Sequence, residues 1–226
     1  MRRAPGQNTC AAVSRCLLCG LALLGTLALA GCVGGEPVPQ DHFYRLPALK
    51  PAKALPTPLV TGTLGVERLR ADGLYQERAM LYIERDHPLQ VQRYHYHHWA
   101  AVPGTMIQQS LVGYLRAAGA AAHVERAAPG LGARARITGR VLRLERMVGG
   151  GPVRVVVELE LHLSPPPRAW GDEAPRDSDA PGPGGDYRAK VRAADASMDA
   201  TVQAYGKALE RIYGRFLHDA RAAAAR

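Results

Sequence analysis

Cysteine is scarce in this chain and confined to its beginning. The 226 residues include four cysteines, at positions 10, 16, 19 and 32. A protein without residues 1–31 would keep one thiol, that of Cys32. Such a chain can form no intramolecular disulfide and no cysteine-ligated metal site, and its folded region has no thiol nucleophile.

Motifs for nucleophilic or nucleotide chemistry are also missing. The sequence has no Gly-x-Ser-x-Gly, the motif that exposes a serine nucleophile on a sharp turn. Gly149-Gly150-Gly151 lacks the Lys-Ser/Thr ending of a phosphate-binding loop and lies between two predicted strands. We therefore expect a protein that is not an enzyme and does not hydrolyse ATP.

Only one long hydrophobic run is present, at residues 17–30. It is shorter than the ~20 residues that a spanning helix needs, so a multi-span membrane protein is excluded. Basic residues precede the run, and no acid occurs before Cys32. A positively charged N-terminal region followed by a short apolar stretch is typical of a secretory signal.

The run ends in Leu29-Ala30-Gly31-Cys32, which resembles the lipobox of bacterial lipoproteins. This resemblance implies a lipoprotein signal peptide over 1–31 and a covalent lipid on Cys32. The alternative is an ordinary secretory signal with a chance cysteine. Residues 32–40 then hold the lipidated cysteine and a tether, in which residues 33–40 reach at most ~28 Å. By resemblance to enteric lipoproteins, the lack of aspartate after the cysteine favours the outer membrane, with the domain facing the periplasm.

The chain is basic, with a formal charge of +9. Six arginines cluster in the region predicted to form a hairpin: Arg134, Arg136, Arg140, Arg143, Arg146 and Arg154. Only Glu145 offsets them within this stretch, so we select Arg140 and Arg143 as candidate contacts for an anionic headgroup or an acidic protein surface. The alternative is a solvated outer strand face. Nucleic acid is not an expected partner, because an exported protein does not meet DNA.

Periodicity predicts one domain over 41–226 with a flexible insertion over 165–186. Strands are predicted at 42–46, 59–69, 80–85, 89–96, 123–126, 133–147, 153–163 and 187–194, and helices at 103–118 and 197–222. This order indicates an α+β fold, a mostly antiparallel sheet covered on one face by the two main helices.

The clearest hairpin joins the strands at 133–147 and 153–163. The second strand alternates strictly, with Val155, Val157 and other aliphatic residues on one face, which indicates a sheet with one buried face. The first strand changes phase between Val141 and Leu142, which predicts a β-bulge. In the last helix, apolar residues from Met198 to Phe216 step by three and four, so this stripe packs on the sheet or on a partner helix.

An aromatic and histidine cluster spans residues 94–99. A zinc site is one interpretation, but its usual carboxylate or cysteine companions are missing. Histidines that hydrogen-bond or face solvent at a strand end are the preferred alternative, and no metal site is predicted. We select Tyr94 and Trp99 as candidate partner contacts, with Trp99 as a buried anchor of the following helix as the alternative.

Several short motifs resemble one family of envelope proteins. They are Phe43-Tyr44-Arg45-Leu46-Pro47 after the lipobox, Leu64-Gly65-Val66, Met80-Leu81-Tyr82-Ile83, Tyr94, and His98-Trp99-Ala100 followed by Pro103, Leu111 and Leu115. Their order is similar to that of the ABC-type transport auxiliary lipoprotein family, which includes the lipoprotein of the paraquat-inducible system. The resemblance spans roughly residues 41–164, and the insertion departs from it.

The resemblance implies a non-catalytic accessory of an ABC-type system that moves lipids or other apolar solutes. Its partners would be a mammalian-cell-entry (MCE) domain protein, a permease and an ATPase, and its only attached group would be the lipid on Cys32. Whether the chain forms a homo-oligomer stays open. Two rival hypotheses are a structural or assembly lipoprotein of the cell envelope or a secretion apparatus, and a metal-dependent envelope hydrolase that uses the histidines.

Overall fold

The computed structural model describes residues 39–164 and 182–225, so the predicted signal peptide, Cys32 and most of the predicted insertion lie outside the described residues. Residues 41–226 group into one compact unit. Its elements in chain order are β1 (His42–Tyr44), β2 (Val60–Val66), β3 (Arg70–Ala71), η2 (Gly73–Gln76), β4 (Ala79–Glu84), β5 (His87–Trp99), α2 (Pro103–Ala118), β6 (Ala121–Arg126), β7 (Ala135–Val148), β8 (Arg154–Ser164), β9 (Gly184–Arg192) and α3 (Met198–Ala224).

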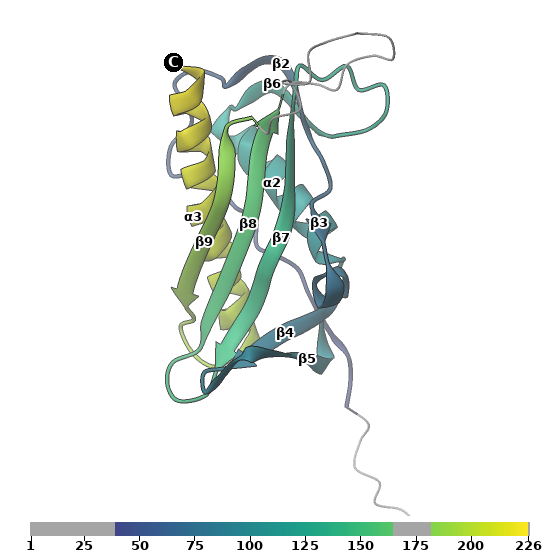
Figure 1. The fold of residues 1–226 in the computed structure, drawn as a ribbon, viewed down its shortest axis with the longest axis vertical. Coiled ribbons are helices and arrows are strands. Elements are labelled where there is room, and N and C mark those ends of the chain that lie inside the picture. Colours follow the sequence, from purple (N-terminus) through teal and green to yellow (C-terminus); the bar gives the residue numbers. More distant parts are fainter. Residues whose placement is uncertain (1–38, 165–181, 226) are drawn as a thin grey trace, which may run out of the picture. The chain divides into compact units, whose positions relative to one another are not determined.

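Strand β7 is the central strand of the sheet (Figure 1). Along one side it pairs antiparallel with β8, which pairs in turn with β9. Along its other side it pairs in succession with β2, β3 and β4, all parallel to it. Strand β6 extends the sheet beyond β2, and β5 and β1 extend it beyond β4.

The α+β fold is confirmed, and its sheet is mixed. The antiparallel ladders β7–β8 and β8–β9 are the longest, and β4–β5 is antiparallel too, which agrees with a mostly antiparallel sheet. Five shorter pairings are parallel. The chain can make them because α2 and long connections return it to the same end of the sheet, as parallel pairing requires.

The predicted β7–β8 hairpin and its bulge are confirmed. The register shifts between Val141 and Arg143, where the phase change had predicted it. Valines and leucines of β8 fill the main core as expected. The opposite face is not wholly solvated, because Val156 joins Ile83 and Met147 in a second small cluster. The β4–β5 turn falls at Arg85–Asp86, earlier than expected, and β5 begins at His87.

Both helices lie on the same face of the sheet (Figure 1). Helix α2 has the predicted bounds and ends at Gly119, whose φ of 65° is the left-handed conformation that glycine adopts readily. Helix α3 begins after Ser197, whose side chain accepts a hydrogen bond from the Ala200 N–H. The apolar stripe of α3 is buried in the core. No helix within residues 39–164 and 182–225 meets the length and hydropathy needed to cross a membrane.

Candidate functional site

Three of the six arginines of the basic hairpin form ion pairs with carboxylates in the described structure. Arg140 lies 2.5 Å from Asp72 and 3.9 Å from Glu160. Arg143 binds Glu145 at 2.6 Å, and Arg136 binds Glu67 at 3.1 Å. Glu145 is the only acid between Arg134 and Arg154 in the sequence, and the fold adds carboxylates from β8 and from the segments after β2 and before η2.

Arg143 has a structural role in this arrangement. Its partner Glu145 is only 1% exposed and also accepts a hydrogen bond from the Tyr75 hydroxyl. The hydrogen bond with Glu145 raises the pKa of Arg143. The pKa of Tyr75 is also raised, mainly by burial and secondly by its hydrogen bond to Glu145. Because loss of Arg143 would leave a buried carboxylate unpaired, this residue stabilises the sheet. Arg140 keeps an exposed position, with its charge shared by two acids.

Trp99 is a core residue. Its side chain is 1% exposed and packs edge-on against Tyr205 of α3, with ring centroids 5.2 Å apart. A side chain at this depth cannot contact a partner in this conformation. The alternative of a buried anchor ahead of α2 therefore describes Trp99, and its selection as a partner contact is corrected.

Tyr94 belongs to a row of rings contributed by three strands. Its ring centroid lies 4.5 Å from that of Tyr82 on β4 and 5.4 Å from that of His97 on β5. His97 also stacks on His42 of β1 at 5.4 Å, and a hydrogen bond of 3.0 Å joins its Nδ1 to the Tyr44 hydroxyl. The parallel pairing of β1 with β5 places His42 opposite His97 and so creates this row.

Arg146 is buried next to these rings. Arg146 is 9% exposed, and its guanidinium lies 5.8 Å from the Tyr94 ring centroid. It donates to the Tyr94 hydroxyl, to the Thr201 Oγ1 at 3.1 Å and to the Ala196 carbonyl. Among the described residues it forms no ion pair. All its acceptors are neutral, which is unusual for a buried cation.

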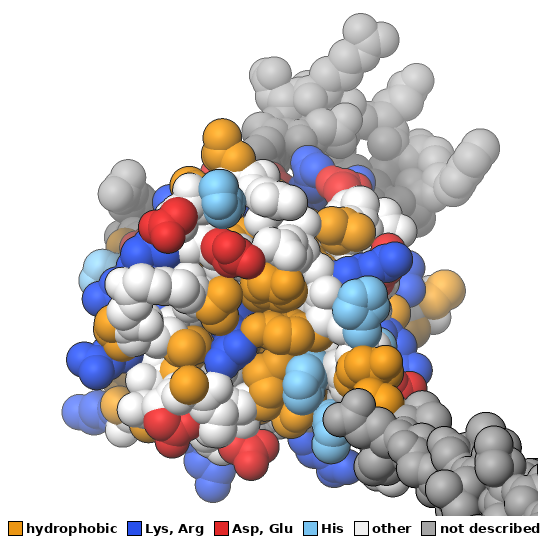
Figure 2. Space-filling model, turned by 90° about the horizontal axis from the view of Figure 1, so that it is seen from below, with side chains coloured by type: hydrophobic (Ala, Val, Ile, Leu, Met, Phe, Trp, Pro, Cys, Tyr) orange, Lys and Arg blue, Asp and Glu red, His pale blue; other side chains and the backbone are white. Residues whose placement is uncertain are grey.

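We call this region the aromatic–arginine end; it consists of His42, Tyr44, Tyr82, Tyr94, His97 and Arg146. It lies at the end of the sheet where α3 begins, and the partial positive charge of a helix N-terminus adds to that of Arg146. Figure 2 shows the domain from below, where hydrophobic side chains gather around a basic one and histidines border them. On β1 and β5, large apolar side chains are exposed, Phe43 by 56% and Tyr96 by 43%.

The pKa of His97 is lowered at this end. Burial is the main cause, followed by the positive charges of His42, Arg146 and His98. Protonation of His97 therefore costs more in the folded chain than in the unfolded one. Its contribution to stability is complete above the unfolded pKa of about 6.5 and is lost as the pH falls toward the lower folded value.

We therefore expect His97→Asn to flatten the dependence of melting temperature on pH between about pH 7 and pH 5. Thermal unfolding of the purified chain, followed by circular dichroism across that range, measures the slope. His123→Asn is the matched control, because His123 is exposed on β6 and forms no ion pair within the described residues. Equal slopes for wild type and His97→Asn would contradict a role for His97 in this pH dependence.

The histidines do not gather into a metal site in the described structure. Within residues 39–164 and 182–225, no three His, Cys, Asp or Glu side chains are close enough together to hold a metal ion. His97 binds Tyr44, and His98 lies 3.4 Å from Asp41. These contacts agree with the strand-end interpretation of the cluster.

Sequence reasoning selected Tyr94 but missed most of its neighbours in space. It did not select Tyr82, Tyr44 or His42, which lie on other strands, and it pooled Arg146 with the surface arginines. The bulge after Val141 was the available signal for Arg146, because a one-residue phase change turns the following even-numbered side chains of β7 toward the core.

The fold identifies the structural class of this protein. It is an α+β domain similar to that of the protein XCC0632 from Xanthomonas campestris, a DUF330 protein, with a TM-score of 0.61 and 18% identity over 78% of this chain and 92% of that chain. The hypothetical protein CT253 from Chlamydia trachomatis is more distant, with a TM-score of 0.47 and 8% identity over 73% and 98% of the two chains. No match was found among curated proteins.

The chain belongs to the family of ABC-type transport auxiliary lipoprotein components, whose family model matches residues 44–214. The match covers most of the chain and runs from Tyr44, the last residue of β1, through the hairpins and into α3. The family resemblance seen in the sequence motifs is thereby confirmed. It identifies an auxiliary lipoprotein component of ABC-type transport that is associated with the cell envelope.

Proposed function

We propose that this protein is a non-catalytic docking component that holds an MCE-domain protein of an ABC-type transport system through its aromatic–arginine end. A lipid on Cys32 anchors it, in our proposal, to the outer membrane, with the domain in the periplasm. The transported solute would be a lipid or another apolar molecule. The permease and the ATPase would complete the system.

Arg146 is the observation that carries the docking role. A buried guanidinium without a carboxylate partner has paid the cost of desolvation and can pair with an acid supplied by another protein. Tyrosine and arginine are the residues most enriched at binding hot spots, because they combine apolar area with directed hydrogen bonds. The aromatic–arginine end contributes both, and Phe43 and Tyr96 are exposed on β1 and β5, two of the strands that form it.

The test is co-purification of the tagged full-length chain from crosslinked envelopes, with bound proteins identified by mass spectrometry. We expect Arg146→Met to lower recovery of the transporter components by about tenfold or more, the loss of one hot-spot contact. Because Arg146 also binds α3, Tyr96→Asp is a second variant that changes only the surface. Leu74→Asp is the matched control, since Leu74 is an exposed apolar residue on η2.

Each outcome has a defined meaning. Recovery of a permease, an ATPase and an MCE-domain protein that falls for Arg146→Met and Tyr96→Asp, but not for Leu74→Asp, supports the proposal. Recovery of secretion-apparatus proteins instead would favour a structural or assembly lipoprotein. Undiminished recovery with a folded Arg146→Met variant would exclude the aromatic–arginine end as the docking surface.

A further inference from the structure

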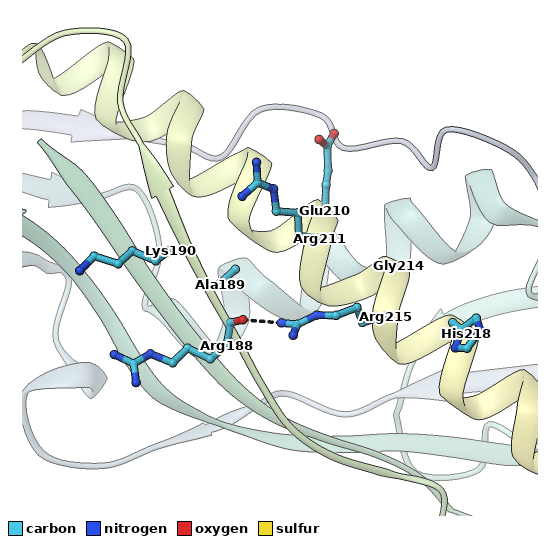
Figure 3. Close-up of a pocket in the computed structure, with 8 residues that line it drawn as sticks. All are labelled: Arg188, Ala189, Lys190, Glu210, Arg211, Gly214, Arg215 and His218. Carbon is cyan, nitrogen blue, oxygen red and sulfur yellow. Dashed lines mark hydrogen bonds between the residues drawn. The ribbon is translucent and has the colours of Figure 1, made fainter. Parts of the chain in front are cut away.

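Strand β9 has an open edge on the side away from β8. Among the described strands it pairs with β8 alone. The carbonyl of Arg188 accepts a hydrogen bond from the Arg215 guanidinium of α3, so this carbonyl points away from β8 (Figure 3). In an antiparallel ladder both backbone groups of a residue point to one side, and the side alternates along the strand. Lys190 therefore also directs its N–H and C=O toward the open edge.

A groove runs between this edge and α3. It has a volume of about 580 Å³ and is lined by Arg188, Ala189 and Lys190 of β9 and by Glu210, Arg211, Gly214, Arg215 and His218 of α3. Figure 3 shows Arg215 reaching from α3 to the backbone of β9, while the side chains of Arg188 and Lys190 extend away from α3. Ala189 and Gly214 are small, so another backbone can come close. An open strand edge beside a helix is the geometry in which a domain accepts an extended peptide as an added strand.

The groove carries an excess of positive charge. Four of its lining residues are Lys or Arg, and Glu210 is the one carboxylate among them. Arg188 shares its charge with Glu158 at 3.7 Å, whereas Lys190, Arg211 and Arg215 form no ion pair with any residue in the described ranges. The pKa of Lys190 is lowered by burial and then by neighbouring arginines, Arg154 first. Lys190 shares the face of Val156, which is the face of the sheet opposite α3, so the unpaired cations on the α3 side of the groove are Arg211 and Arg215.

We propose that the groove between β9 and α3 binds an extended acidic segment of a partner protein, which adds to β9 as a further strand. The open backbone groups of β9 would bind the segment's backbone, and Arg211 and Arg215 of α3 would bind the carboxylates on the face of the segment that is turned toward α3. A membrane surface fits less well, because headgroups gain nothing from a strand edge or from the small side chains at Ala189 and Gly214. The groove is separate from the aromatic–arginine end and shares none of its residues.

The test uses the full chain in detergent and a fluorescein-labelled, N-acetylated decapeptide of alternating threonine and glutamate. We expect saturable binding by fluorescence anisotropy and slower amide hydrogen exchange in β9. Methylating alternate peptide nitrogens should weaken binding by about tenfold, the effect of losing one or two net backbone hydrogen bonds. Arg211→Glu should weaken it similarly, while Arg126→Glu, an equal charge change at an exposed site on β6, should leave it unchanged.

Four results would overturn the proposal. If binding is insensitive to N-methylation, it is ionic attraction without strand addition. If Arg126→Glu weakens binding as much as Arg211→Glu, only the overall charge matters. If the peptide does not bind but phosphatidylglycerol vesicles do, and Arg211→Glu abolishes that binding, the groove recognises a lipid surface. Absence of both interactions would mean that the cations merely protect an edge strand from aggregation.

Discussion

The Leu209→Asp variant is expected to lose about 4 kcal/mol or more of unfolding free energy. Leu209 lies at the centre of the α3 stripe, is fully buried and belongs to the main core. Aspartate removes the apolar contacts of leucine and places a carboxyl group in the hydrophobic core, where its charged form is strongly disfavoured. Since the unfolding free energy of a domain is roughly 5–15 kcal/mol, this loss would remove a large part of it.

Thermal denaturation of the purified chain is the measurement, with an expected fall in melting temperature of roughly 10 °C or more. Gln203→Asp is the control, because Gln203 lies on the same helix with its side chain exposed. That variant should melt within a few degrees of the wild type. A Leu209→Asp protein as stable as the wild type would show that the α3 stripe does not need burial.

Replacing Cys32 by serine is expected to abolish lipidation completely. No other cysteine follows residue 19, so the chain offers no substitute thiol near the predicted cleavage site. We expect the variant to incorporate no alkyne-labelled fatty acid and to keep the mass of the uncleaved precursor. A diacylglycerol supplies two chains, enough for stable anchoring where a single chain is marginal.

Cys19→Ser is the matched control for this experiment, because that thiol lies within the predicted signal peptide and its loss should leave labelling unchanged. A second form tests the anchor itself. In it, an ordinary cleavable secretory signal replaces residues 1–31 of the Cys32→Ser variant, and we expect the product in the soluble periplasmic fraction. Membrane-bound product of this form would mean that something other than a lipid on Cys32 holds the protein at the membrane.

Local patterns predicted much of this fold. The bounds of α2, the β7–β8 hairpin and the bulge after Val141 all follow from periodicity and from glycine or proline at element ends. The parallel pairings of β2, β3 and β4 with β7 could not be predicted in this way. They depend on where α2 and the long connections return the chain, and no short stretch of sequence encodes that.

The candidate site was less accessible to sequence reasoning. A ladder between β1 and β5 brings His42 to His97, two segments more than fifty positions apart. Arg146 was within reach, because the bulge predicted at Val141 implies that even-numbered residues beyond it turn inward. The net charge of the hairpin was misleading, since Asp72 and Glu67 reach Arg140 and Arg136 only through the tertiary fold.

The position of β7 as the central strand of the sheet also constrains the order in which the chain can fold. Strands β2, β3 and β4 are synthesised well before residues 135–148, the strand they all pair with. Until β7 arrives, their edges remain open, and pairings between segments so distant in sequence form slowly. The β4–β5 and β7–β8 hairpins can form early because their contacts are local. A chain in which β7 has not yet formed therefore exposes the strand edges of its N-terminal half, and exposed strand edges favour aggregation.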